Sequence, residues 1–198
     1  MRFLFRVLLL LVAASGAIAF GALSAERVTR SFHGFVPIDT GTWRAYPGLA
    51  TSAADPYARA HLARSGKLPI ADTEGIEFTA TRDTQGDLLR AACDYYVVGN
   101  LPANRLWTFR VAPIDSAATR DVWNETVANS RLHARTGQND VSLYVGQTPA
   151  GINWYPLDAS DVQAVMFIMT FYDSAVATTA SFTDLEMPVI ERLRCADG

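Results

Sequence analysis

The stretch that decides the fold reads IEFTATRDTQGDLLRAACDYYVV and covers residues 76–98. Apolar and polar residues alternate from 76 to 81, and Cys93, Tyr95 and Val97 share one face in the second half, which is the two-residue period of a β-strand. Between these segments, the sequence Asp83 to Gly86 has Asp first and Gly fourth, as in a β-turn. We therefore predict a hairpin in which Ile76–Ala80 pairs with the return strand Ala91–Val98.

Further strands are predicted along the rest of the chain. The apolar run Val165–Tyr172 is nearly continuous, which favours a strand covered on both faces. Many short strands, few helices and frequent Gly or Pro between them predict a mainly β fold, a jelly-roll-like antiparallel β-sandwich. The other predicted strands are Leu106–Val111, Val141–Val145 and Val189–Leu193.

One helix is predicted at the entry to the sandwich. Asp55 is a good N-cap, Pro56 suits the first turn, and Gly66 stands where a C-terminal cap is expected. The helix has one stripe that should pack onto the sheet, formed by Tyr57, Ala58, His61 and Leu62. A second, smaller docking pair is predicted at Trp123 and Val127.

The N-terminus differs in kind from the rest of the chain. Arg2 and Arg6 precede an uncharged run, Val7–Ala25, whose 19 residues would make a helix of roughly 28 Å, close to the hydrocarbon thickness of about 30 Å. We predict an uncleaved membrane anchor. A cleaved signal peptide, with Ala17-Ile18-Ala19 as its site, is the alternative, and a buried core helix is a third.

These segments define the expected organisation and location. Residues 1–25 are the anchor or signal, 26–49 a tether and 50–198 the sandwich domain. The positive-inside rule places the domain outside the cytoplasm, so we expect a single-pass inner-membrane protein with a periplasmic domain, or a periplasmic protein after cleavage. Beyond Arg2 and Arg6 the chain has 15 basic and 20 acidic residues.

The predicted location bears on the oxidation state of the two cysteines. Cys93 and Cys195 would meet an oxidising compartment, and an even count without a CxxC spacing favours one structural disulfide. The alternative is two separate thiols, with Cys93 a small core residue.

Composition and motifs exclude several classes of function. The chain has a net charge of −3 and scattered basic residues, which argues against a nucleic-acid partner. The three histidines, His33, His61 and His133, lie far apart, so we expect no metal site. There is no GxSxG, Walker or GxGxxG motif, and no cofactor is expected.

Paired carboxylates are the remaining catalytic option. Glu77 and Asp94 lie on neighbouring predicted strands, where they could approach each other as glycosidases require. The alternative is that both are solvated outward positions on the hairpin. A hydrolase would use two of Glu77, Asp83, Asp94 and Asp140 beside an exposed aromatic residue.

Several short motifs occur in order along residues 50–192. They are Asp55-Pro56-Tyr57-Ala58-Arg59-Ala60, Glu77 with Asp83 and Gly86, Cys93-Asp94-Tyr95, Arg105-Leu106-Trp107-Thr108, and Asn153-Trp154 with Pro156. In order and spacing they resemble the domain of unknown function 1214 family of bacterial envelope proteins. The resemblance implies a jelly-roll-like sandwich and no established reaction. The chain departs from the family pattern at Thr170, where many relatives have arginine, and at Tyr155, where they have leucine.

A binding surface is better supported than a catalyst. Aromatic residues with a polar edge are numerous, among them Trp43, Tyr96 and Tyr144, and such residues stack on sugars or fill apolar pockets. We expect an envelope scaffold or binding module for a glycan, lipid or protein partner; the alternative is a carboxylate-dependent carbohydrate-active or ester hydrolase. The candidate binding residues are Arg59, Arg105, Trp107, Asn153, Trp154 and Tyr155.

Four of these candidates also have a structural alternative. Trp107 shares a strand face with Phe109 and suits core packing, and Trp154 could plug the end of the sandwich. Arg59 and Arg105 could bind a carboxylate or phosphate bidentately, or form salt bridges with a nearby aspartate, Asp55, Asp83 or Asp94.

Overall fold

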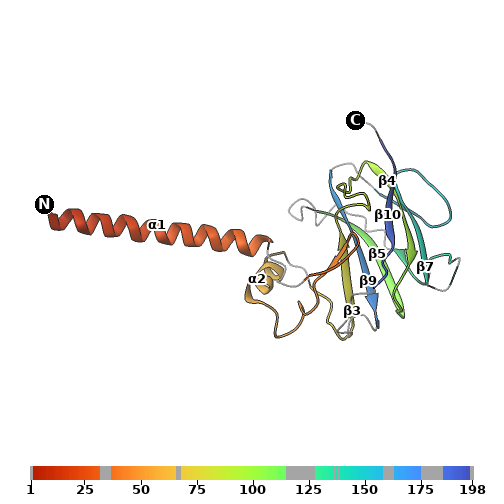
Figure 1. Ribbon diagram of the computed structural model, residues 1–198, viewed down its shortest axis with the longest axis horizontal. Helices are drawn as coiled ribbons and strands as arrows, with labels where there is room; N and C mark the ends of the chain where they lie inside the picture. Colours follow the sequence, from red (N-terminus) through yellow and green to blue (C-terminus); the bar gives the residue numbers. More distant parts are fainter. Residues whose placement is uncertain are drawn as a thin grey trace.

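The protein is described from a computed structural model in which two β-sheets pack face to face and a long helix extends from them (Figure 1). The described residues are 2–31, 37–65, 68–114, 128–135, 137, 139–157, 163–174 and 185–196. The predicted cap at Gly66 and the predicted docking pair Trp123 and Val127 lie outside them.

A six-stranded sheet with the order β1-β2-β3-β9-β5-β6 faces a four-stranded sheet with the order β10-β4-β7-β8. All pairs are antiparallel except β7 with β8, which is parallel. The mainly β, jelly-roll-like sandwich predicted from the sequence is confirmed. The strands are β1 Ile38–Thr40, β2 Trp43–Ala45, β3 Gly75–Ala80, β4 Cys93–Asn100, β5 Leu106–Pro113, β6 Ala128–Asn129, β7 Asp140–Gly146, β8 Trp154–Pro156, β9 Val165–Tyr172 and β10 Val189–Cys195.

The core lies between the sheets and is rich in aromatic rings. Phe167 of β9 meets Tyr95 of β4 edge-on at 5.4 Å and Phe109 of β5 at 5.3 Å between ring centroids. Such edge-to-face pairs add to the hydrophobic stabilisation from burial. On the opposite face of β9, Ile168 and Thr170 are also buried, so the prediction of a strand covered on both faces is confirmed.

The predicted hairpin is wrong, because residues 76–80 and 91–98 do not pair with each other. The turn itself is present, with Gly86 at φ +90° and its N–H donating to the Asp83 carbonyl at 3.0 Å. After the turn the chain crosses the core, burying Leu89, and enters the other sheet as β4. The alternation of apolar and polar residues shows which face of a strand is apolar, but it does not identify the neighbouring strand. In the structure β3 pairs with β9 and not with β4.

The predicted tether over residues 26–49 also needs correction. Residues 26–31 continue the N-terminal helix, and 38–45 form the β1–β2 hairpin at the edge of the six-stranded sheet. Trp43 is buried, and its indole Nε1 donates to the Pro188 carbonyl at 2.7 Å. Strands of three residues carry too little alternation to be recognised from the sequence, so the sandwich begins earlier than predicted.

The N-terminal helix α1, Arg2–Ser31, projects away from the sandwich (Figure 1). It is long and apolar enough to cross a membrane, with a mean hydropathy of 2.3, and its apolar window makes no buried contact. The short helix α2, Pro56–Ser65, lies beside its end. His61 Nδ1 lies 3.1 Å from the Thr29 carbonyl, and Arg64 pairs with Glu26 at 3.7 Å.

Helix α2 begins as the sequence predicts. The Asp55 carboxylate accepts the backbone N–H of Tyr57 at 2.8 Å, which satisfies a donor that the first turn leaves without a partner. Ala58 is buried, and His61 and Leu62 are half-buried, in line with the predicted stripe. The predicted packing partner is wrong, because among the described elements α2 packs mainly against α1 and not onto the sheet. Tyr57 lies at the edge of the stripe and is 49% exposed, so it is not part of the packed face.

Candidate binding site

Three aromatic side chains lie together on the outer face of the four-stranded sheet, and we call them the aromatic platform: Tyr96, Tyr144 and Trp154. Tyr96 and Tyr144 are directly opposite in register on β4 and β7, and their rings stack at 4.5 Å between centroids. Trp154 of β8 is in register with Tyr144 on its other side. All three are partly exposed, because their inward-facing neighbours on the same strands supply the core.

A cavity of about 430 Å³ adjoins the platform and is lined by Trp154, Tyr144, Leu193 and Arg194 among others. The indole Nε1 of Trp154 donates to the Gly146 carbonyl at 3.1 Å, which fixes the orientation of the ring. Trp154 is therefore neither a fully buried plug nor a freely rotating surface residue.

Glycine at position 151 allows the turn before β8 to approach the platform. Gly151 has φ +68°, and a Cβ there would lie 3.0 Å from Cε2 of Tyr144. The turn therefore rests against the Tyr144 ring and delivers Trp154 beside it.

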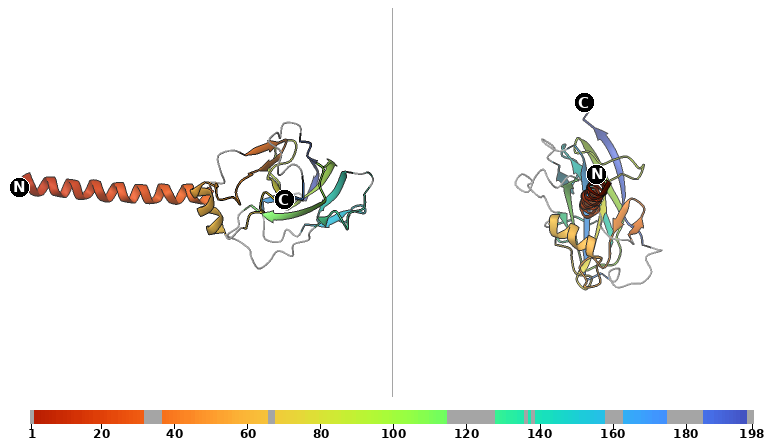
Figure 2. Two further views of the ribbon diagram at one scale, coloured as in Figure 1. Left: turned by 90° about the horizontal axis from the view of Figure 1, so that it is seen from below. Right: turned by 90° about the vertical axis from the view of Figure 1, so that its left-hand side faces the viewer.

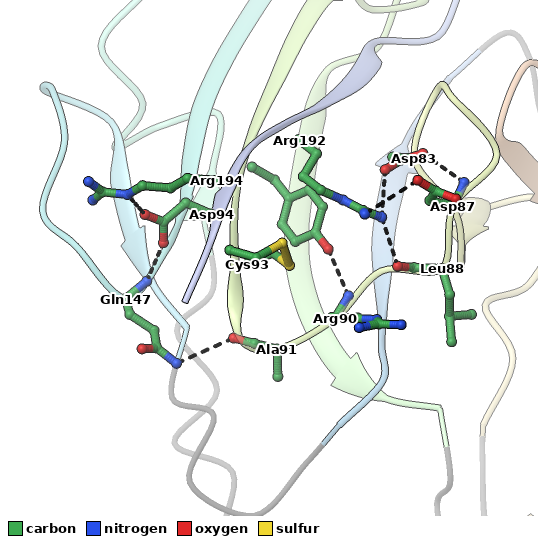
Figure 3. The surroundings of a disulfide bond; sticks show 12 residues. Asp83, Asp87, Leu88, Arg90, Ala91, Cys93, Asp94, Gln147, Arg192 and Arg194 are labelled. Atoms are coloured by element: carbon green, nitrogen blue, oxygen red, sulfur yellow. Dashed lines mark hydrogen bonds and ion pairs between the residues drawn. A yellow bond between two sulfur atoms is a disulfide. The ribbon is translucent and has the colours of Figure 1, made fainter. Parts of the chain in front are cut away.

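The polar edge of the cavity is an ion pair between neighbouring strands (Figure 3). Arg194 Nε donates to Asp94 Oδ2 at 2.7 Å, and the other carboxylate oxygen accepts the Gln147 N–H at 2.9 Å. A side chain at Gly146 would collide with that oxygen, since a Cβ would lie 2.0 Å from it. Asp94 is thus held in place, while Arg194 stays 61% exposed and able to bind a polar group.

The strand that supplies Arg194 is held by a disulfide. Cys93 and Cys195 are bonded across β4 and β10 with Cα atoms 3.9 Å apart, so the predicted bridge is confirmed (Figure 3). Further along β10, Arg192 pairs with Asp83 at 2.8 Å and donates to the Leu88 carbonyl at 3.1 Å. Because Asp83 is only 1% exposed, this pair fixes the 83–88 turn to β10.

Two of the predicted binding residues have structural roles instead. Asn153 is buried, and its side chain both accepts from the N–H of Ala134 and donates to its carbonyl, each at 2.9 Å. It thereby joins the turn before β8 to the 130–135 loop. Trp107 is 4% exposed and meets His133 edge-on at 5.2 Å, so the core interpretation holds for it.

His133 lies in the same buried polar cluster. Its Nε2 accepts the N–H of Ser142 at 3.5 Å and lies 3.4 Å from Asn153 Nδ2, while its Nδ1 is buried without a hydrogen-bond partner among the described residues. Burial lowers the pKa of His133, because the charged ring would lose its hydration; nearby Arg135 lowers it further, and Asp140 opposes this.

A decrease in pH is expected to destabilise the domain through His133. The unfolded chain protonates this ring below about pH 6.5, whereas the folded state keeps it neutral to a lower pH. The free energy of unfolding should therefore fall as the pH drops below about 6.5, until the lowered pKa is reached. Urea unfolding between about pH 7.5 and 5 should show this slope, and His133→Asn should flatten it; an unchanged slope in the variant would contradict the assignment.

The remaining predicted binding residues lie away from the platform. Arg59 is exposed on α2, and Arg105 precedes β5 in the other sheet, where it pairs with Asp173 at 3.4 Å. That partner is none of the aspartates that the sequence suggested. Tyr155 points inward and packs against the core, and this burial raises the pKa of its hydroxyl.

The four candidate carboxylates are not arranged as a catalytic pair. Glu77 and Asp94, which the sequence placed on neighbouring strands, lie in different sheets. Glu77 pairs with Arg110 at 3.4 Å, and Asp140 accepts the Gly137 N–H at 2.7 Å. Within the described ranges, no group of three or more His, Cys, Asp or Glu residues could hold a metal ion.

A larger groove, of about 1860 Å³, runs along the outer face of the six-stranded sheet and the adjoining segments. Glu77 and Asp83 both line it, and each is bound to an arginine, Arg110 and Arg192 respectively. Another of its cations, Arg44, is bound to Asp39 at 2.6 Å. We prefer the platform as the candidate site because its partly exposed tyrosine rings stack on the outer face of a sheet.

Part of the platform could be recognised from the sequence and part could not. Trp154, Tyr96 and Tyr144 stand out as aromatic residues with a polar edge, but the stacking of the two tyrosines depends on the β4–β7 register. Arg194 was missed as a site residue, because it reaches Asp94 through the pairing of β10 with β4, 100 residues apart.

No family model and no curated protein matches this chain, so the resemblance described above stays a prediction. The chain is similar to the crystal structure of the VPA0106 protein from Vibrio parahaemolyticus, with 18% identity, a TM-score of 0.52, and coverage of 72% of this chain and 36% of that one. It is also similar to a putative uncharacterized protein from Burkholderia cenocepacia, with 15% identity, a TM-score of 0.44, and coverage of 89% and 42%. The chain thus spans less than half of the length of each, and the first likeness supports the fold alone.

Proposed function

We propose that this chain is a membrane-anchored envelope protein whose periplasmic β-sandwich is a binding module for a glycan, recognised on the aromatic platform. A lipid or a protein partner is the other kind of ligand that such a module could take. The observation that carries the proposal is the row of three partly exposed rings on the outer face of a sheet, beside a cavity.

The chemistry of the platform suits a sugar chain. The C–H groups on one face of a pyranose ring pack against an aromatic ring, and its hydroxyl groups need hydrogen-bonding partners at the edge. Tyr96, Tyr144 and Trp154 offer the rings, while Arg194, which is 61% exposed, offers a charged donor. Rigid aromatic side chains lose little conformational entropy on binding, which favours recognition by a preformed surface.

The hydrolase alternative has less support. A glycosidase needs one carboxyl group with a raised pKa beside a second carboxylate. Here Glu77 and Asp94 lie in different sheets, and Glu77 and Asp83 are each bound to an arginine, Arg110 and Arg192 respectively. We therefore prefer binding without catalysis.

The anchor is supported by helix α1. Its apolar window is 0% buried within the described part of the chain, and Arg2 and Arg6 stand before it, as the positive-inside rule requires for a domain outside the cytoplasm.

A periplasmic reporter fused after Gly198 is expected to be active. The reason is the position of Arg2 and Arg6, which should keep the N-terminus in the cytoplasm. The protein should stay in the membrane fraction with the mass of the uncleaved chain. Activity of a cytoplasmic reporter alone would contradict the topology, and a mass reduced by cleavage after Ala19 would contradict the anchor.

Trp154→Ala is expected to abolish glycan binding with a small loss of stability. The variant loses the stacking surface and one hydrogen bond, which is worth about 1 kcal/mol. The test is calorimetric titration of the full-length protein with soluble cell-wall glycan fragments, with dextran for comparison.

Two control variants make this test specific. Trp154→Phe keeps a ring and should keep part of the affinity, while Ile152→Ala changes a residue that is 88% exposed in the adjacent turn and should bind normally. A Trp154→Ala protein that binds as tightly as the wild type would rule out the platform. If it lost binding together with about 3 to 5 kcal/mol of stability, Trp154 would be a core residue.

A further inference from the structure

Helix α2 lies on the side of the domain from which α1 emerges. In the view from the N-terminal end of α1, α2 lies beside α1, transverse to the α1 axis and in front of the sandwich (Figure 2). If α1 crosses a bilayer along the membrane normal, α2 lies parallel to the membrane surface.

The contacts between α1 and α2 indicate how deep α2 lies in the membrane. The apolar run of α1 ends at Ala25, and α2 contacts the next turn, with Arg64 on Glu26 and His61 on Thr29. At about 1.5 Å per residue, Thr29 lies only about 6 Å beyond the end of that run. The headgroup layer is roughly 5 to 8 Å thick on each side of the hydrocarbon, so these contacts lie within it.

The exposed face of α2 suits that layer. Its packed side carries Ala58 and Leu62, and its exposed side carries Arg59 and Ala63. Arg64 lies 3.7 Å from Glu26 of α1 and is still 52% exposed, so it can also reach the layer. Arginine binds phosphate oxygens in a bidentate manner. The chain beyond Arg2 and Arg6 is acidic as a whole, so this basic face is a local exception that would turn toward anionic lipid.

We propose that α2 lies in the headgroup layer of the membrane that α1 spans, and that Arg59 and Arg64 bind the phosphates of anionic phospholipids there. This proposal rests on the uncleaved anchor and is independent of glycan binding. It gives Arg59 a partner of the kind that its sequence motif suggested, a phosphate, and it holds the domain at a fixed orientation above the membrane.

The test uses full-length protein reconstituted in phosphatidylcholine vesicles with and without phosphatidylglycerol. An environment-sensitive dye is attached to Ala63→Cys on α2 or, for comparison, to Ile152→Cys in the turn next to β8. That turn adjoins the four-stranded sheet, which lies on the far side of the sandwich from α1 (Figures 1 and 2). A headgroup-labelled quencher lipid should quench the dye at 63 and leave the dye at 152 unquenched, and phosphatidylglycerol should increase quenching at 63.

Charge variants test the role of the arginines. Arg59→Gln with Arg64→Gln should remove the effect of phosphatidylglycerol, while the matched pair Arg105→Gln with Arg131→Gln, which changes two exposed arginines elsewhere, should keep it. Equal quenching at 63 and 152 in protein shown by its mass to be uncleaved would overturn the position of α2 and leave the anchor intact. A phosphatidylglycerol effect that survives in the Arg59 and Arg64 variant would overturn their assignment.

Discussion

Replacing both cysteines, as Cys93→Ala with Cys195→Ala, is expected to lower the free energy of unfolding by about 4 to 5 kcal/mol. The bridge closes a loop with a sequence separation of 102, and a long loop loses much conformational entropy in the unfolded chain when it is closed. Because a small domain is stable by only about 5 to 15 kcal/mol, this loss is large. Urea unfolding of the full-length protein in detergent, followed by near-ultraviolet circular dichroism, measures it.

The same variant tests whether the bridge holds the site. Without it, β10 keeps its backbone pairing with β4 and the ion pair of Arg194 with Asp94. We therefore expect glycan binding to survive at temperatures where the variant is folded. A midpoint of unfolding equal to that of the wild type, or free thiols that can be alkylated in the purified wild-type protein, would contradict the structural role of the bridge.

Arg192→Met is expected to cost about 3 to 5 kcal/mol, because it leaves the buried Asp83 carboxylate without its cation. An aspartate that is 1% exposed cannot regain its hydration unless the turn opens, so the loss of its cation destabilises the folded state. Adding Asp83→Asn to Arg192→Met removes the orphaned charge and should restore part of the loss.

An exposed ion pair provides the control for this prediction. Arg105 and Asp173 are 81% and 70% exposed, so Arg105→Met should cost less than about 1 kcal/mol. Similar losses for Arg192→Met and Arg105→Met, or no rescue by Asp83→Asn, would show that the buried pair does not anchor β10.

The positions of the strands can be predicted well from the sequence, but their pairing cannot. Val165–Tyr172 was predicted with the same bounds as β9, since a continuous apolar run needs no knowledge of its neighbours. Partners depend on the whole fold, and therefore β3 was assigned to β4 although its true neighbours are β2 and β9. The β1–β2 hairpin was missed because its short strands show no period.

The same limit applies to the site. Trp154 could be selected from its position in a turn rich in Gly and Pro, and it lines a cavity. Asn153, beside it in the same motif, is a structural residue whose bonds to Ala134 depend on a loop 19 residues away. The polar partner of the platform, Arg194, comes from the last strand, and local sequence contains no sign of that contact.

The most direct test of the central claim, glycan recognition by the aromatic platform, is the indole N–H region of the nuclear magnetic resonance spectrum during glycan titration. Trp154 adjoins the cavity, while Trp43 and Trp107 are buried in the core. The account predicts that the Trp154 signal shifts in a saturable manner and that the signals of Trp43 and Trp107 stay in place. A spectrum in which the Trp154 signal does not move at saturating glycan would contradict it.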